Sequence, residues 1–209
     1  MRGLYDLKPW YTRRLDLFLR IAVRRRTSPD VFTGLGVLSA AAAGFAIAHG
    51  LWPAALVLLA GRLAGANLDG AVARARGVSR PWGFVLNEVG DRGSDLLMFA
   101  GLAVLAARDP RVPSALVWAL VAAVAATLPT FASLAGSGAG AARVNGGPFG
   151  KTERCAVVVL ATALPAWIPA LCGVIVAGSV LTAAVRLLRV RVSLAARAAP
   201  SAPTPTPRR

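Results

Sequence analysis

The sequence is short of acidic residues. Only 9 of its 209 residues are Asp or Glu, against 24 Lys and Arg, so the formal net charge at pH 7 is +15. It has two cysteines and one histidine. Two cysteines cannot form a disulfide framework, so we interpret Cys155 and Cys172 as apolar packing residues. We interpret His49 as a loop residue without a chemical role.

Polar residues are also scarce over long stretches. The chain is 56% hydrophobic with a mean hydropathy of +0.60, values far from those of a soluble protein of this length. Runs with few charges can hold helices of about 20 residues, which cross about 30 Å of hydrocarbon. No run alternates as a barrel strand does, so we expect helices. The runs are 31–50, 51–66, 96–107, 112–142 and 155–185.

The last apolar run could form one helix or two helices joined between Pro165 and Pro169. Charge decides between them, because cytoplasmic loops carry an excess of Lys and Arg. Eight Lys and Arg precede Asp30, which places the N-terminus in the cytoplasm, and only a sixth span places the six C-terminal arginines there as well. The prediction is an all-α integral membrane protein with six transmembrane helices and both termini cytoplasmic.

Three regions follow from this reading. Residues 1–29 form a basic amphipathic segment, either an interfacial helix on anionic lipid or a plain positive flank. Residues 30–193 form the six-helix domain, and 194–209 form a Pro-rich disordered tail. The positive charge is spread over cytoplasmic helix ends, so we expect the phospholipid bilayer as the partner and no nucleic acid. A homodimer is compatible with the sequence.

Four of the nine acids fall in one window, from Leu68 to Asp95. A carboxylate at membrane depth costs several kcal/mol unless it pairs, binds a cation or faces a wet cavity. The window is therefore the candidate functional site. Its acids are Asp69, Glu88, Asp91 and Asp95.

The spacing of these acids indicates a metal site. Asp69 is expected near the cytoplasmic end of the second span and Asp91 in the first half of the third, so antiparallel packing brings them face to face. Asn87, Asp91 and Asp95 recur every four residues on one helix face. Oxygen ligands without His or Cys suit Mg²⁺, Ca²⁺ or Mn²⁺. The alternative is a network of buried ion pairs with three arginines: Arg62, Arg74 and Arg92.

The residues after Asp69 favour a phosphate site. Gly70 and Ala73 leave the neighbouring helix surface open, and Arg74 lies one turn beyond. A guanidinium can hold phosphate oxygens with two hydrogen bonds. A cation, an open surface and an arginine together indicate that a phosphate binds here.

These residues resemble the signature of the CDP-alcohol phosphatidyltransferase family, D-x-x-D-G-x-x-A-R, eight residues, then G-x-x-x-D-x-x-x-D. The matching residues are Asp69, Gly70, Ala73, Arg74, Gly83 and Asp91. Ser28 to Thr33 resembles the family's entry into its first span. Ala66 and Asn87 stand where the family has its first and third aspartates. The blocks LYDLKPWYTRR, LNEVGDRGSD and NGGPFGKTER look like a bacterial branch of the family.

The resemblance implies an enzyme of phospholipid biosynthesis in the bacterial cell membrane, with its site facing the cytoplasm. A CDP-linked lipid such as CDP-diacylglycerol is held by one or two Mg²⁺ or Mn²⁺ ions, an acceptor hydroxyl attacks the phosphorus, and CMP is released. The implied metal ligands are Asp69, Asn87 and Asp91, and Asp91 is the implied catalytic base. The implied CDP-lipid-binding residues are Asp69, Gly70, Ala73, Arg74, Thr33 and Arg80.

The two replaced aspartates leave three alternatives open. Asp69, Asp91 and the Asn87 carbonyl hold one metal; or Glu88 repairs the site; or the chain binds a CDP-linked lipid without catalysis. A transporter or lipid-binding scaffold is a further alternative, disfavoured because no internal repeat is found and the acids gather at one end.

The acceptor is expected at the glycine-rich loop 146–154. This loop ends in Lys151 and Arg154, although topology alone also calls for cations there. The identity of the acceptor alcohol stays open.

Overall fold

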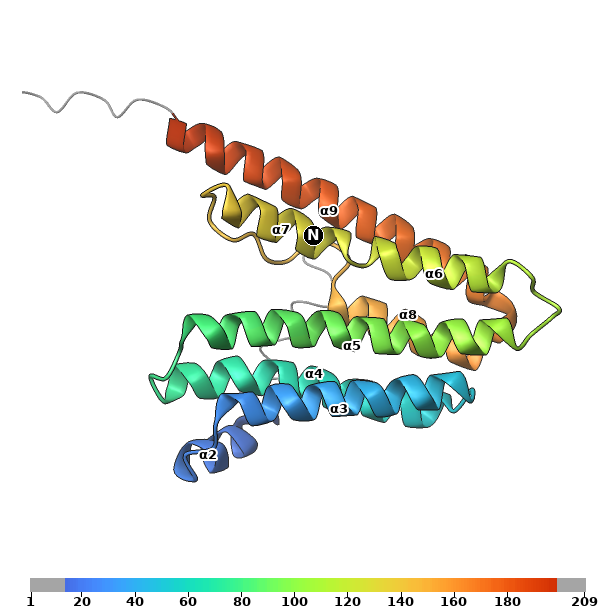
Figure 1. The fold of residues 1–209 in the computed structure, drawn as a ribbon, viewed down its shortest axis with the longest axis horizontal. Coiled ribbons are helices and arrows are strands. Elements are labelled where there is room, and N and C mark those ends of the chain that lie inside the picture. Colours follow the sequence, from blue (N-terminus) through green and yellow to red (C-terminus); the bar gives the residue numbers. More distant parts are fainter. Residues whose placement is uncertain (1–13, 199–209) are drawn as a thin grey trace, which may run out of the picture.

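The computed structural model describes residues 14–198, which are mostly helical and contain no strand. The long helices lie side by side in an elongated bundle (Figure 1). The elements are α2 (Asp16–Arg24), α3 (Pro29–Ala48), α4 (Trp52–Ala75), α5 (Pro81–Ala107), α6 (Ala115–Ala125), α7 (Leu128–Gly138), α8 (Lys151–Ala163), the 3-10 helix η2 (Pro165–Trp167) and α9 (Ile168–Ala198).

Prolines and glycines set the helix boundaries in the first half. Pro29 begins α3, and the Ser28 side chain accepts a hydrogen bond from the Asp30 amide. Gly50 and Gly77 have φ of 70° and 63°, a backbone conformation that favours glycine, and they follow the ends of α3 and α4. Short turns therefore make each of the helices α3, α4 and α5 antiparallel to the one before it.

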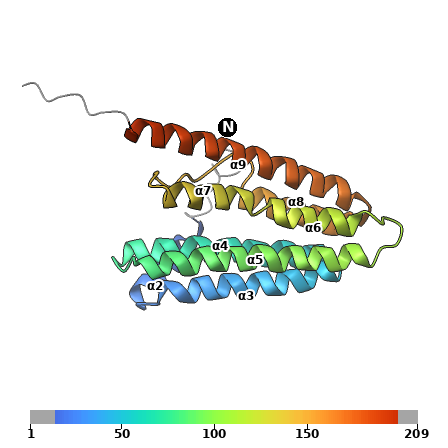
Figure 2. The same ribbon diagram turned by 45° about the horizontal axis from the view of Figure 1, so that its top comes forward.

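Helix α3 packs closely against both α4 and α5 through glycines. A Cβ atom at Gly65 of α4 would lie 2.6 Å from the Phe32 carbonyl oxygen, and a Cβ at Gly101 of α5 would overlap the Gly44 carbonyl. Small residues of this kind let helix backbones approach in a membrane. Helices α4 and α5 contact α3 extensively and each other little. On the side away from α3, α9 covers α6 and α7 (Figure 2).

Four helical stretches are long and apolar enough to cross a membrane: Pro29–Ala48, Trp52–Ala75, Ala115–Gly138 and Pro165–Arg197. Within residues 14–198 the structure is thus mostly helical without strands, and it has four candidate membrane-spanning helices, as a multi-pass membrane protein requires. Helix α5 carries three of the four acids of the window and α8 has only 13 residues, and neither belongs to this set. The count of six spans and the side of the termini therefore stay predictions.

The expected break at Pro165 is present, since α8 ends before it and η2 begins with it. Helix α8 begins well inside the bundle, because the preceding loop folds back along α7 (Figure 1). The Ser133 hydroxyl of α7 donates to the Val144 carbonyl at 2.6 Å, and Thr182 of α9 bonds both the amide and the carbonyl of Phe149. These contacts place Lys151, the first residue of α8, among the other helices.

The two terminal regions are described only in part. Helix α2 exposes the apolar side chains of Leu17, Phe18 and Ile21 and buries Ala22. Residues 1–13 of the predicted interfacial segment lie outside the described part. At the other end α9 continues to Ala198, past the tail's expected start at 194, and 199–209 lie outside the described part.

Candidate active site

The acidic window opens onto two adjoining clefts. The main cleft, of about 560 Å³, lies between α4, α5, α7, α8 and the loop that precedes α8. The side cleft, of about 490 Å³, lies between the start of α3, the end of α4 and the start of α5. Four residues line both clefts and join them: Asp69, Gly70, Arg74 and Asn87.

The carboxylate of Asp69 is held in a fixed orientation. Asp69 is 5% exposed, its Oδ2 accepts from the Thr33 hydroxyl of α3 at 3.0 Å, and its Oδ1 accepts from the Gly70 amide. Two donors from two helices fix the side chain at the junction of the clefts. Thr33, predicted to contact the CDP-lipid, therefore also positions Asp69.

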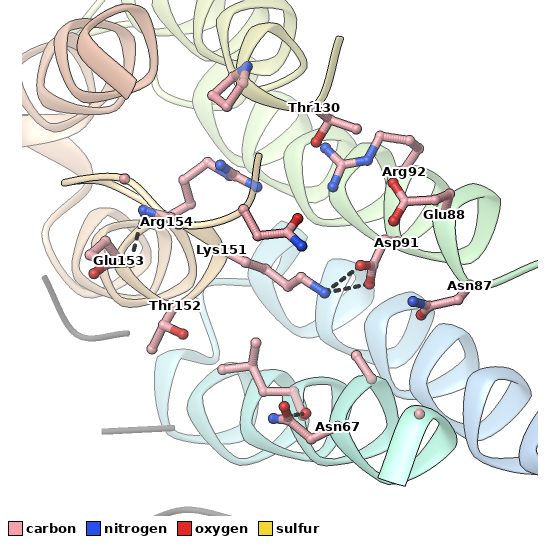
Figure 3. Close-up of a pocket in the computed structure, with 18 of the residues that line it drawn as sticks. Asn67, Asn87, Glu88, Asp91, Arg92, Thr130, Lys151, Thr152, Glu153 and Arg154 are labelled. Atoms are coloured by element: carbon pink, nitrogen blue, oxygen red, sulfur yellow. Dashed lines mark hydrogen bonds and ion pairs between the residues drawn. The ribbon is translucent and has the colours of Figure 1, made fainter. Parts of the chain in front are cut away.

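Asp91 is bound by a lysine from a distant part of the chain. The Lys151 ammonium of α8 lies 2.5 Å from both carboxylate oxygens of Asp91 on α5. Figure 3 shows Lys151 reaching across to Asp91, with Asn87 beside the pair. Asp69 and Asp91 line the same main cleft, as the antiparallel arrangement predicts.

The positions of the two replaced aspartates also face the main cleft. Ala66 and Asn87 line it together with Glu88. The Glu88 carboxylate, however, forms an ion pair with Arg143 from the loop before α8. This arrangement does not support repair of the metal site by Glu88, because the Glu88 carboxylate already pairs with Arg143.

Asp95, the last member of the predicted stripe, has a different environment. It is 4% exposed and contacts three arginines: Arg62 at 2.5 Å, Arg92 at 2.9 Å and Arg154 at 3.2 Å. These arginines come from α4, α5 and α8. The predicted alternative, a network of buried ion pairs that includes Arg62 and Arg92, is therefore correct for Asp95. Asp69 and Asp91 instead line the main cleft.

The predicted CDP-lipid-binding residues lie around the side cleft, which is lined by Thr33, Asp69, Gly70, Ala73, Arg74 and Arg80. Arg74 also lines the main cleft, so a guanidinium stands between the two spaces. Arg80 is paired with Asp30 at the start of α3. The structure therefore brings this predicted set together.

The predicted acceptor residues, Lys151 and Arg154, line the main cleft. Two further cations there, Arg143 and Arg186, were not predicted as site residues. Arg186 of α9 donates to the Gly146 carbonyl at 2.9 Å and to the Pro129 carbonyl at 2.7 Å. In the sequence it counted only as a topological charge, since nothing local links α9 to the loop 40 residues earlier.

The main cleft carries an excess of positive charge. Its lining has six cationic side chains and four carboxylates, which leaves a net charge of +2. Such a lining favours an anionic ligand and concentrates it from solution. The cations are Arg74, Arg92, Arg143, Lys151, Arg154 and Arg186.

The oxygen donors of the cleft fit a hard divalent cation. Within residues 14–198, no three His, Cys, Asp or Glu residues group closely enough to hold a metal by themselves. Asp69, Asn87 and Asp91 nevertheless line one cleft with an open side. Mg²⁺ commonly uses one or two protein carboxylates and completes its coordination with substrate phosphates and water.

Comparisons with known proteins point to one family. No family model matches the sequence. The chain is 32% identical over 148 residues to phosphatidylinositol phosphate synthase of Mycolicibacterium smegmatis. The aligned region covers 69% of this chain and 65% of that relative, just under two thirds of its length.

Solved structures agree. The Mycobacterium tuberculosis phosphatidylinositol phosphate synthase with CDP-DAG bound has a TM-score of 0.75 and 25% identity, covering 91% of this chain and 100% of that one. Its complex with manganese and citrate has a TM-score of 0.73 and 25% identity, covering 88% and 92%.

The signature from Asp69 to Asp91, the clefts that its residues line, and these relatives confirm the resemblance of this chain to the CDP-alcohol phosphatidyltransferase family.

Proposed function

We propose that this protein transfers a phosphatidyl, or related phospho-alcohol, group from a CDP-linked lipid to an acceptor hydroxyl and releases CMP. One observation carries the proposal: the signature residues of α4 and α5 line two clefts that join at Asp69 and Arg74. A relative whose structure has CDP-DAG bound supports CDP-diacylglycerol as the donor. The reaction belongs to phospholipid biosynthesis.

The donor occupies the side cleft and extends to the junction. Arg74 lies where the clefts join, so its guanidinium holds the diphosphate by paired hydrogen bonds. Gly70 has no side chain, and a Cβ there would come within 3.1 Å of the Arg74 guanidinium. Thr33, Ala73 and Arg80 complete the wall of the side cleft.

Asp69, Asn87 and Asp91 would hold a single Mg²⁺ or Mn²⁺ ion. The Ala66 methyl group supplies no donor, and Glu88 is paired with Arg143, so the ligands for a second ion are lacking. When bound, the ion supplies positive charge that stabilises the diphosphate and the leaving CMP.

Asp91 is the catalytic base. The acceptor oxygen forms a bond to the phosphorus that carries the lipid group, the bond from this phosphorus to the CMP oxygen breaks, and CMP leaves with the bonding electrons. The acceptor proton passes to the Asp91 carboxylate. This assignment requires that the Lys151 ammonium move away from Asp91, because the ammonium contacts both carboxylate oxygens and one of them must receive the proton.

The acceptor carries a phosphate of its own. Lys151, Arg154 and Arg186 line the part of the main cleft formed by α8, α9 and the loop before α8. Their excess positive charge suits a phosphate-bearing alcohol better than a neutral one. The name of the aligned relative, a phosphatidylinositol phosphate synthase, supports such an acceptor.

The site faces the cytoplasm of a bacterial inner membrane. The turn between α4 and α5, helix α2 and the C-terminal end of α9 lie at one end of the bundle (Figure 1), and these segments are rich in arginine. Cytoplasmic loops carry this bias. The same end holds both clefts, because their shared residues lie near the α4–α5 turn.

A second candidate function is a CDP-lipid-binding protein without catalysis. It is favoured by the replacement of two signature aspartates by Ala66 and Asn87 and by the lysine on Asp91. It differs from the first function only in the chemical step.

Release of CMP decides between the two functions. Purified protein in detergent is mixed with CDP-diacylglycerol, Mg²⁺ or Mn²⁺, and in turn inositol phosphate, glycerol phosphate and serine. We expect acceptor-dependent CMP release that is largest with a phosphate-bearing acceptor. Tight binding of CDP-diacylglycerol without CMP release from any acceptor would assign the second function. Asp109→Asn, which changes an acid in the distant α5–α6 loop, serves as the control.

A further inference from the structure

Lys151 occupies the Asp91 carboxylate that the proposed ion also needs. Its ammonium lies 2.5 Å from both oxygens, and the Asp91 side chain is 15% exposed. An ammonium and a divalent cation on one partly buried carboxylate repel each other strongly, because charges are poorly screened there. Binding of the ion to Asp91 therefore requires Lys151 to leave.

Lys151 has another position available within reach of the same cleft. It is the first residue of α8, its side chain is 25% exposed, and a lysine has a flexible four-carbon stem. The main cleft extends to Arg186, which forms no ion pair among the residues that the structure describes. An anion bound between Arg186 and the start of α8 would attract the Lys151 ammonium.

We propose that Lys151 is an exchangeable cation that competes with the divalent ion for Asp91 and transfers to an anionic acceptor when the acceptor binds. The proposal rests on the proposed function for the identity of the cleft. Its consequence is coupled binding: the acceptor's phosphate frees Asp91 for the ion. Because linkage is reciprocal, the ion must raise the affinity for the anion by the same factor. Without an acceptor, the site then disfavours the ion, and Asp91 stays paired.

The parent protein tests the coupling without turnover. Binding of Mn²⁺ to the purified protein in detergent is measured from the free Mn²⁺ signal in electron paramagnetic resonance. Sulfate serves as the tetrahedral dianion, and chloride at equal ionic strength is the control. We expect saturating sulfate to tighten Mn²⁺ binding about tenfold, within the usual range of couplings of about 5- to 150-fold. Equal Mn²⁺ affinity in sulfate and chloride would overturn the proposal.

Variants at Lys151 locate the effect. Lys151→Met should tighten Mn²⁺ binding about tenfold in chloride and abolish the response to sulfate, because Asp91 is then permanently free. Lys151→Arg keeps the charge and should keep weak binding in chloride. Arg186→Met removes a cation of the same cleft, and Arg186 contacts backbone carbonyls and no carboxylate among the described residues. It should change Mn²⁺ affinity in chloride less than twofold and weaken the sulfate response.

Equal tightening by Lys151→Met and Arg186→Met would show a general charge effect and would contradict exchange at Asp91. These measurements use only Mn²⁺ and sulfate, so they are independent of catalysis. A coupled but inactive protein would contradict the proposed function alone. An active protein without the sulfate effect would contradict this inference alone.

Discussion

Asp91 and Asp95 lie one turn apart on α5, yet their surroundings are opposite. Asp91 faces a cleft and pairs with one partly exposed lysine, whereas Asp95 is buried among three arginines from α4, α5 and α8. A partly solvated carboxylate whose one partner is itself partly exposed can bind an ion or take a proton. A buried carboxylate with fixed partners holds helices together. The carboxylate proposed for catalysis, Asp91, and the carboxylate that stabilises the bundle, Asp95, are thus separated by a single helical turn.

The largest effect on stability should come from Asp95→Asn. Removing this charge leaves Arg62 and Arg154 buried without their counterion, and loss of one partner of a buried pair costs about 3–5 kcal/mol. Thermal unfolding in detergent should show a large decrease in Tm. Asp109→Asn breaks only the loop pair with the exposed Arg111, so it should leave Tm nearly unchanged. Similar melting of the two variants would remove the structural role from Asp95.

A smaller effect is expected at the junction of the clefts. Arg74→Lys keeps the charge but loses the planar pair of donors, so it should weaken binding of CDP-diacylglycerol about tenfold, in line with about 1.5 kcal/mol for a hydrogen bond to a charged group. Isothermal titration of the lipid in mixed micelles measures this. Arg108→Lys, at the opposite end of the bundle, is the control. Unchanged affinity in Arg74→Lys would place the diphosphate elsewhere.

The smallest effect, a change in Mn²⁺ affinity, is expected at Ala66 and Asn87, the two positions where the family has aspartates. Asn87→Asp should tighten Mn²⁺ binding several-fold, and the double change with Ala66→Asp should tighten it further, because added negative charge in a partly desolvated cleft attracts the ion. Asn67→Asp adds the same charge to the lining of the main cleft, one position from Ala66 on α4, and is the matched control. If all three changes act alike, the ligand positions are not those of the signature.

The sequence predicted well the residues that α4 and α5 contribute to this site, and poorly the contacts made by α8, α9 and the loop before α8. Asp69, Arg74 and Asp91 were found because a specific spacing on two successive helices places them together. The contact of Asp91 with Lys151 joins residues 60 positions apart, and it depends on the loop before α8 folding back into the bundle. Helical periodicity gives the face of a residue on its own helix. It does not show which side chain of a later helix arrives opposite.

The arginines show the same limit. Positive charge near the C-terminus was read as topology, and this reading concealed that Arg186 reaches the loop carbonyls beside the cleft. The ion-pair alternative from the sequence names Arg62, Arg74 and Arg92 as partners of the window's carboxylates, and two of them, Arg62 and Arg92, pair with Asp95. Arg154, its third partner, was assigned to the acceptor instead, and it lines the cleft as well.

The most direct test of the central claim is CMP release per folded molecule of Asp91→Asn. We expect this variant to melt near the temperature of the parent protein and to lose CMP release by at least about 100-fold, because a positioned base contributes about 10²–10⁴ to the rate. CMP release at the parent's rate from folded Asp91→Asn protein would contradict the account, since the carboxylate that faces the cleft would then take no part in the reaction.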